Sequence, residues 1–219
     1  MTKDDAYYAR AEGEGTRKAR HPTKGSRGKR NAAQREALTR EDWILAARKA
    51  LIRGGIGAVR IVPLAEALNV TRGGFYWHFK GRQDLLDALL DDWVRTNTAA
   101  FEGVLKEPGR SGRAEFRTIV DVWVNEKDYS PAWDAAVRHW AGLSRKVAAV
   151  VKRVDQHRID IVHQIFLDVG YRDPEALVRA RITYFHQVGY YALGLEETRE
   201  RRLELIPVYI DSLIGKPPA

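Results

Sequence analysis

The chain has 219 residues, of which 44% are hydrophobic, and it carries a formal net charge of +8. This length and apolar content are sufficient for a folded core, so a fully disordered protein is excluded. The absence of cysteine excludes disulfide bonds, cysteine–zinc sites and a thiol nucleophile, and it favours the reducing cytoplasm as the location.

Positive charge is concentrated in the N-terminal third of the sequence. Residues 1–37 contain ten Lys and Arg against five Asp and Glu, and residues 38–82 contain eight against three, whereas residues 83–219 are net −2. A surface that faces a polyanion needs this distribution, although a basic segment that only aids solubility is an alternative. No apolar run reaches the ~18 residues of a membrane span, so we expect no membrane partner.

Residues 1–37 show no hydrophobic periodicity, and the stretch TRKARHPTKGSRGKR at 16–30 has no acidic residue. We therefore expect a disordered basic arm. It either adds contacts to DNA phosphates or to the minor groove, or it is a solvated tail.

Three short helices are predicted after this arm. Thr39 is placed to cap the first, with Leu38 and Trp43 as a hydrophobic staple, and a Gly-Gly pair at 54–55 ends it. The second begins near Val62, because the following proline is tolerated only in a first turn. Asn69 accepts the left-handed backbone of a tight turn, and a third helix then runs from a Thr cap at 71 to 79. This spacing predicts a helix-turn-helix.

The third helix has the unusual sequence TRGGFYWHFK at 71–80. A helical winding places Phe75 and Phe79 on one side, facing the core of the small domain. The opposite side carries Arg72, Gly73, Tyr76, Trp77 and Lys80. Glycine allows close approach of a backbone, and aromatic and cationic side chains suit a DNA groove. The alternative is that Tyr76 and Trp77 pack against their own subunit.

The remaining sequence predicts an all-α C-terminal part without strands or internal repeats. The expected elements are a long helix from Asp84 towards Leu105, a helix over 114–127, one starting at Ser130-Pro131, one over 144–169, one capped by Asp173 with proline at the first position, and a last helix kinked at Pro207. Residues 183–197 and apolar residues of the last helix are predicted to form a dimer interface, with a monomer's ordinary core as the alternative.

Aromatic residues and histidines of this part could line a pocket for a small hydrophobic or aromatic effector. The candidates are Phe101, Trp123, Trp133, His139, Trp140, His157, Ile161 and Tyr184. His157 is placed on the apolar stripe of the 144–169 helix, where it needs a partner from the protein, a water or a ligand. Each aromatic residue could equally belong to a packed core.

No catalytic motif was found, and Asp91-Asp92 is explained as a solvated helix edge. The six-residue separation of His157 and His163 places them on different helix faces. We therefore expect no enzymatic activity, no cofactor and no metal site.

The stretch LAEALNVTRGGFYWHFKGRQDLL at 64–86 resembles the TetR family of bacterial transcription regulators. The resemblance covers about 45 residues, and it departs at Asn69, where the family usually has glycine. It implies an all-α homodimer with a helix-turn-helix DNA-binding domain at 38–85 and a helical effector-binding and dimerisation domain at 86–219. It also implies a repressor that a small molecule releases from a palindromic operator; an architectural or effector-independent DNA-binding protein is the alternative.

Carried over position by position, the resemblance implies contacts with double-stranded DNA from Arg60, Thr71, Arg72, Gly73, Gly74, Tyr76, Trp77, His78, Lys80 and Arg82. Arg72 and Trp77 are expected to contact bases. Tyr76, His78 and Lys80 are expected to contact the sugar–phosphate backbone.

Overall fold

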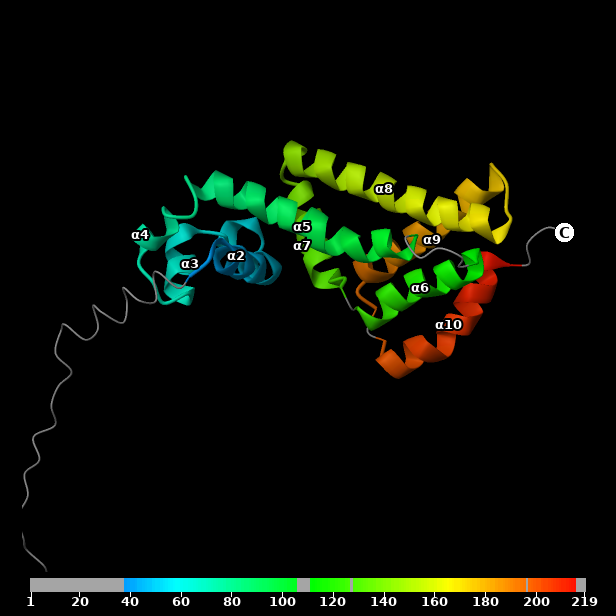
Figure 1. Ribbon diagram of the computed structural model, residues 1–219. Coiled ribbons are helices and arrows are strands. Elements are labelled where there is room, and N and C mark those ends of the chain that lie inside the picture. The colour runs from blue at the N-terminus through cyan, green and yellow to red at the C-terminus, as the bar shows by residue number, and fades with distance from the viewer. Residues whose placement is uncertain (1–37, 106–110, 127, 196, 216–219) are drawn as a thin grey trace, which may run out of the picture. The chain divides into compact units, whose positions relative to one another are not determined.

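The computed structural model describes residues 38–105, 111–126, 128–195 and 197–215. The elements in chain order are α2 (Arg40–Gly54), the short 3-10 helix η1 (Ile56–Ala58), α3 (Ile61–Ala67), α4 (Arg72–Phe75), α5 (Arg82–Val104), α6 (Gly112–Asn125), α7 (Pro131–Ala141), α8 (Arg145–Val169), α9 (Glu175–Ala192) and α10 (Arg199–Ile214) (Figure 1). No strand occurs in these ranges, which confirms the all-α prediction. The predicted basic arm, residues 1–37, lies outside the described residues.

Threonine or serine side chains cap the N-termini of several helices. Thr39 accepts a hydrogen bond from the backbone N–H of Asp42, whose carboxylate accepts from the backbone N–H of Thr39 at 2.8 Å. Ser130 caps α7 and Ser144 caps α8 through the same kind of bond. A cap of this type stabilises a helix by about 1 kcal/mol, so the local sequence determines these boundaries.

The helix predicted over 114–127 is α6, which begins and ends two residues earlier, at Gly112 and Asn125. Two other predicted boundaries are wrong. The third helix, expected to reach residue 79, ends at Phe75, and residues 76–78 form turns in which the N–H of His78 donates to the carbonyl of Phe75 at 3.0 Å. Two consecutive glycines weaken helix propagation by about 1 kcal/mol each. Asp173 does not cap α9, because Pro174 holds that position and the Asp173 carboxylate lies 2.7 Å from Nε2 of His163.

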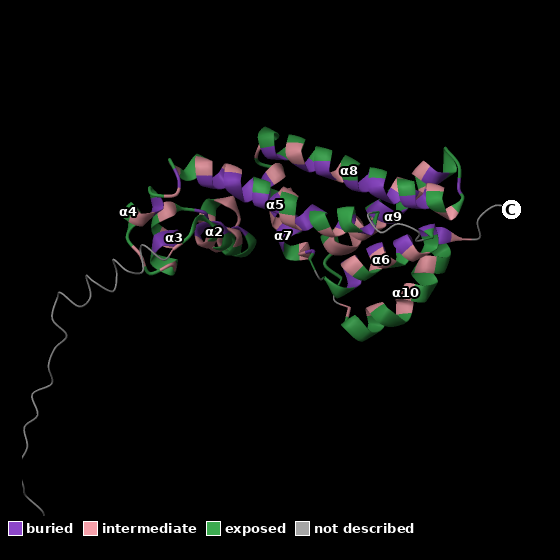
Figure 2. Ribbon diagram, in the orientation of Figure 1, coloured by how far each residue is buried: buried purple, intermediate pink, exposed green. Residues whose placement is uncertain are grey.

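Buried apolar residues form two clusters. Figure 2 shows the buried positions along the helices. One joins α2, α3 and α4 to the first half of α5, to α7 and to the start of α8. The other joins the end of α5, α6, the second half of α8, α9 and α10. The boundary expected between residues 85 and 86 falls inside α5, so this helix contributes to both clusters. Within the described ranges, no helix has the length and apolarity needed to cross a bilayer.

Arg158 is the buried polar residue on the apolar side of α8, with 1% of its surface exposed. Its guanidinium donates to the Asp134 carboxylate at 3.0 Å and to the carbonyl of Asn97 at 3.0 Å, and it lies 5.0 Å from the ring centroid of Phe101. The prediction for His157 is wrong, because that side chain is exposed and faces Glu102 at 3.4 Å. The 100° step between adjacent helix positions puts Arg158, and not His157, in the interior.

Asp134 holds a second cation as well, since Arg138 donates to its carboxylate at 2.6 Å. Burial alone would raise the pKa of Asp134, but the attraction of Arg158 and Arg138 and their hydrogen bonds hold it below its usual range. Arg138 also donates to Asp155 and to the hydroxyl of Tyr184. This network ties α7, α8 and α9 together without an unpaired buried charge.

Replacing Arg158 by methionine should lower the free energy of unfolding by about 3 kcal/mol, because the change leaves a buried carboxylate with one cation fewer. Urea unfolding at fixed protein concentration measures this loss. The control is Arg153→Met, which removes an exposed arginine from the same helix. Equal stability of the two variants would show that the ion pair does not stabilise the fold.

Candidate nucleic-acid interface

Aromatic packing fixes the orientation of α4. The rings of Trp43 and Phe75 meet edge to face with centroids 5.3 Å apart, and Phe75 stacks on Phe79 at 5.3 Å. All three side chains are buried, and the guanidinium of Arg40 covers the Phe79 ring at 4.6 Å. The structure therefore confirms the prediction that Phe75 and Phe79 point inward.

The turn between α3 and α4 depends on Asn69. Its φ of 56° is left-handed, a conformation that asparagine tolerates better than most residues. The N–H of the next residue, Val70, donates to the carbonyl of Ala65 at 2.9 Å and closes the turn. Asparagine thus provides the left-handed backbone of the turn at the position where it replaces the usual family glycine.

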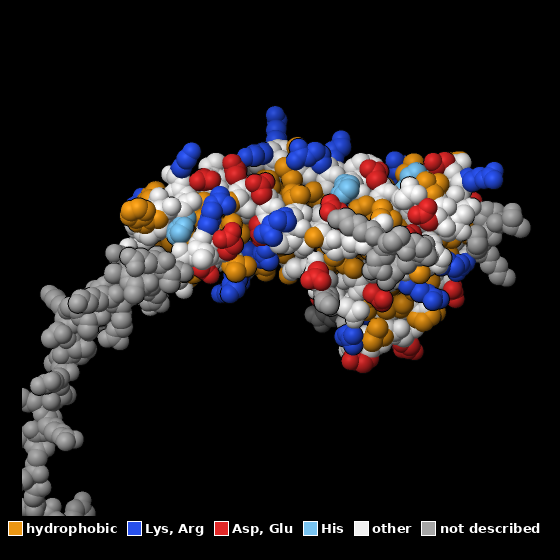
Figure 3. All heavy atoms as spheres, viewed as in Figure 1, with side chains coloured by type: hydrophobic (Ala, Val, Ile, Leu, Met, Phe, Trp, Pro, Cys, Tyr) orange, Lys and Arg blue, Asp and Glu red, His pale blue; other side chains and the backbone are white. Residues whose placement is uncertain are grey.

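The outward side of α4 and the following turn carries the predicted contact residues. Trp77 has 86% of its surface exposed and Tyr76 48%. Thr71, Arg72, Gly73 and Lys80 are also exposed, while Gly74 and His78 are half-buried. Figure 3 shows hydrophobic side chains exposed at the end of the domain where α4 lies. The alternative that Tyr76 and Trp77 pack inside their own subunit is wrong.

Arg72 and Tyr76 are organised before any partner binds. The Arg72 guanidinium donates to the Tyr76 hydroxyl at 2.9 Å and lies 5.7 Å from the centre of its ring. Holding a long cationic side chain in one position lowers the entropy that binding would otherwise cost. The pair therefore presents a positioned cation beside an exposed aromatic ring.

The glycines of α4 are not required by the protein's own packing. A Cβ atom at Gly74 would meet no atom within 4 Å, and one at Gly73 would meet only the Thr71 hydroxyl at 3.7 Å. Neither residue has a positive φ. Since neither sterics nor backbone conformation demands glycine, the free space points to close approach by a partner.

Two predicted arginine contacts have different surroundings. Arg60 is exposed at the N-cap of α3. The guanidinium of Arg82 donates to the carbonyls of Val59 at 2.6 Å and Ile56 at 2.8 Å. These bonds fasten the start of α5 to the segment before α3, so Arg82 supports the fold in addition to any contact with a phosphate.

Arg48 connects the helix-turn-helix to the rest of the chain. Its side chain projects from α2 and donates to the carboxylate of Asp92 on α5, and its guanidinium lies 5.3 Å from the ring of Trp133 on α7. Asp92 is buried, so the expectation of a solvated helix edge is wrong for this residue. Asp92 also accepts from Arg95 at 2.9 Å. A shift of α5 or α7 would therefore be passed to α2 by a charged contact.

The predicted ligand-binding residues do not line one common cavity. Most of them are buried in the two clusters: Phe101, Trp123, Trp133, Trp140 and Ile161. Tyr184 is buried in the network around Asp155, where burial raises its pKa to about 12, and His139 and His157 are exposed. Of this set, only Trp123 lines the cavity between α6, α9 and α10.

Sequence reasoning missed most of that cavity. It is lined by Thr183, Gln187 and Tyr190 of α9, among others. Their spacing of four and three residues places them on one helix face, and this spacing could have been recognised in the sequence. Within the described ranges, no group of three or more His, Asp or Glu side chains is arranged to hold a metal ion.

The all-helical architecture and the exposed α4 define a helix-turn-helix protein. The family model "Bacterial regulatory proteins, tetR family" matches residues 44–89. Residues 44–89 therefore carry the DNA-binding domain that this family model describes.

Individual relatives agree with this assignment. The HTH-type transcriptional regulator TtgR of Pseudomonas putida is 39% identical over 59 residues, which are 27% of this chain and 28% of TtgR. The chain thus matches less than a third of that relative's length. The crystal structure of E. coli NemR in its reduced form has a TM-score of 0.65 at 16% identity, covering 83% of this chain and 100% of that one. A TetR transcriptional regulator from Legionella pneumophila has a TM-score of 0.62 at 18% identity, covering 82% and 98%. At these identities the two structures show a shared fold.

Replacing Gly74 by alanine should stabilise the fold by about 0.5–1 kcal/mol, because the methyl group meets no neighbour and the unfolded chain loses freedom. The same variant should bind a selected duplex about tenfold more weakly, the scale of one lost base contact. Thermal unfolding and fluorescence anisotropy measure the two effects.

Gly103→Ala is the matched control, since a Cβ there also meets no atom within 4 Å. It should leave duplex affinity unchanged. Tight duplex binding by Gly74→Ala would contradict the assignment of α4 to the interface.

Proposed function

We propose that this protein is a sequence-specific DNA-binding transcriptional regulator. The observation that carries the proposal is the surface of α4, where Tyr76 and Trp77 are exposed beside a positioned Arg72 and two glycines that the fold does not need. A short helix of this kind can enter the major groove, where side chains read base edges. The net charge of +5 over residues 38–82 supports attraction to the phosphate backbone.

A homodimer is the second part of the proposal. α9 exposes Val178, Ile182 and Phe185 at helical spacing, and α10 exposes Leu203 and Val208. Exposed apolar residues on two adjacent helices are typical of a surface that another protein covers. Two copies related by a two-fold axis would present two α4 helices, about 34–36 Å apart, to successive major grooves of a palindromic operator.

The third part of the proposal is that the protein represses transcription and that a small molecule releases it from its operator. A ligand that favours one spacing of the two helix-turn-helix domains shifts the population towards it and changes operator affinity. The contact of Arg48 with Asp92 and Trp133 supports a route by which movement of α5 or α7 reaches α2. The proposed location is the cytoplasm, without enzymatic activity of its own.

Selection of bound duplexes from a random pool tests the proposal. The expected result is one roughly palindromic sequence, bound at least a thousandfold more tightly than random duplex at the same salt concentration. Arg72→Ala should relax the preference at one position of each half-site, at a cost of about 1–3 kcal/mol. A ratio near one for every duplex would instead identify an architectural DNA-binding protein.

Replacing Phe185 by glutamate should give a monomer, because a charge in an apolar contact loses its hydration without gaining a partner. Sedimentation of wild type and variant measures the change, and operator affinity should fall with it. Leu143→Glu is the control, since Leu143 is exposed on the turn after α7. A dimeric Phe185→Glu protein would remove this face of α9 from the interface.

A further inference from the structure

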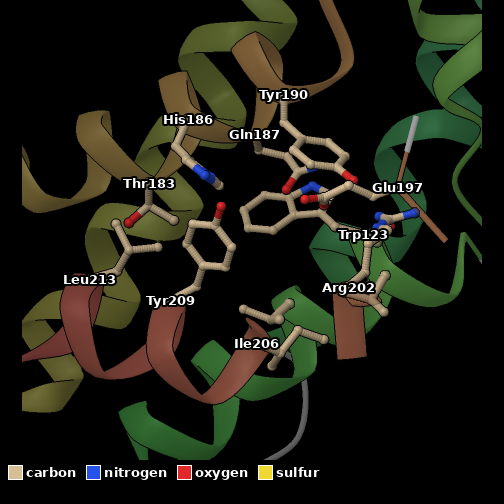
Figure 4. Close-up of a pocket in the computed structure, with 12 residues that line it drawn as sticks. Trp123, Thr183, His186, Gln187, Tyr190, Glu197, Arg202, Ile206, Tyr209 and Leu213 are labelled. Carbon is tan, nitrogen blue, oxygen red and sulfur yellow. Dashed lines mark hydrogen bonds between the residues drawn. The ribbon is translucent and has the colours of Figure 1, made fainter. Parts of the chain in front are cut away.

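A small cavity lies between α6, α9 and α10 (Figure 4). Trp123 and Val120 of α6 form one wall, α9 contributes Thr183 and Gln187, and α10 closes the cavity with Ile206, Tyr209 and Leu213. Its volume is about 60 Å³. Of the residues that the sequence predicted for an effector pocket, only Trp123 lines this cavity, so the cavity is largely a different site from the expected one.

Two buried polar atoms at the cavity lack hydrogen-bond partners among the described residues. They are the hydroxyl oxygen of Thr183, a residue with 1% of its surface exposed, and Nε2 of Gln187. More than about 90% of buried polar groups in proteins are paired, and leaving one unpaired costs about 1–3 kcal/mol. The two residues are one helical turn apart on α9, so a single small molecule can reach both.

The charged groups at the rim already have hydrogen-bond partners within the protein. Arg202 donates to the carboxylate of Glu126 at 2.9 Å and to the carbonyl of Trp123 at 3.0 Å. Glu197 accepts from the hydroxyl of Tyr190 at 2.9 Å. A charged ligand would have to break these pairs, so the site favours an uncharged one.

The walls are aromatic. The ring of His186 lies 4.8 Å from that of Tyr209 and 6.5 Å from that of Tyr190, and Figure 4 shows these rings around the cavity with the Trp123 indole. Burial lowers the pKa of His186, so its imidazole is neutral near pH 7. Flat, neutral surfaces on several sides suit an aromatic ring.

We propose that this cavity binds a small, uncharged, single-ring aromatic molecule that accepts a hydrogen bond from Nε2 of Gln187 and exchanges another with the Thr183 hydroxyl. An aromatic amide or ketone has this chemistry. The binding site stands on its own geometry, whereas its regulatory consequence rests on the proposed function.

The cavity must widen for such a ring, because an engineered cavity that admits benzene has about 150 Å³. The helix that can move is α10: of its residues, all of which the structure describes, only Ile214 is buried. Ile206 and Tyr209 would swing outward with it. Since α10 carries part of the proposed dimer surface, a bound ring changes the geometry of that surface.

Benzamide is the probe. Toluene, which lacks the amide, and benzoate, which carries a negative charge, are the control ligands with the same ring. Titration of the full chain by calorimetry should show benzamide binding at least tenfold more tightly than toluene, and no binding of benzoate. Thr183→Val and Gln187→Met should each weaken benzamide binding about fivefold to tenfold, the size of one hydrogen bond. Thr98→Val is the control, because it also removes a buried, unpartnered hydroxyl but lies outside the cavity.

Failure of benzamide to bind, equal binding of toluene, or unchanged affinity in both cavity variants would each overturn the proposed site. These results do not depend on DNA. A protein that selects an operator but binds no benzamide keeps the proposed function and loses the site. A protein that binds benzamide through Thr183 and selects no operator keeps the site and loses the function.

Discussion

The packing of Phe75 between Trp43 and Phe79 determines which way the helix-turn-helix faces. With both phenylalanines held inward, the turn at 76–78 that joins them leaves Tyr76 and Trp77 on the surface. Burying two such rings stabilises the small domain by several kcal/mol, which offsets the cost of exposing two others. The fold therefore maintains an apolar, aromatic surface that a solitary soluble domain would avoid.

Charged contacts join the helix-turn-helix to the helices that follow it and also link those helices to one another. Arg48 links α2 to α5 and α7, and Arg158 with Asp134 links α7 and α8 to α5. Buried pairs of this kind fix one arrangement, because any displacement leaves a charge without its partner. Such contacts transmit a shift between helices more faithfully than apolar packing, which slides at lower cost. The proposed effector mechanism depends on that property.

Local signals in the sequence predicted most of the helices and the direction of α4. The Thr39 cap and the Asn69 turn are decided by residues within a few positions, so the sequence contains the necessary information. The features that sequence reasoning missed depend on contacts between residues that are distant in the sequence. Arg158 is buried because Asp134 and Asn97, distant in the sequence, accept its hydrogen bonds. The cavity likewise depends on how α10 packs against α6 and α9, which periodicity within one helix cannot show.

Hydroxyl-radical footprinting of the protein with its selected duplex tests the central claim most directly. Trp77 should react strongly in the free protein and become protected at saturating duplex, while the exposed Leu143, far along the chain on the turn after α7, stays reactive. Such selective protection would place α4 against DNA. Undiminished reactivity of Trp77 in the saturated complex would contradict the account.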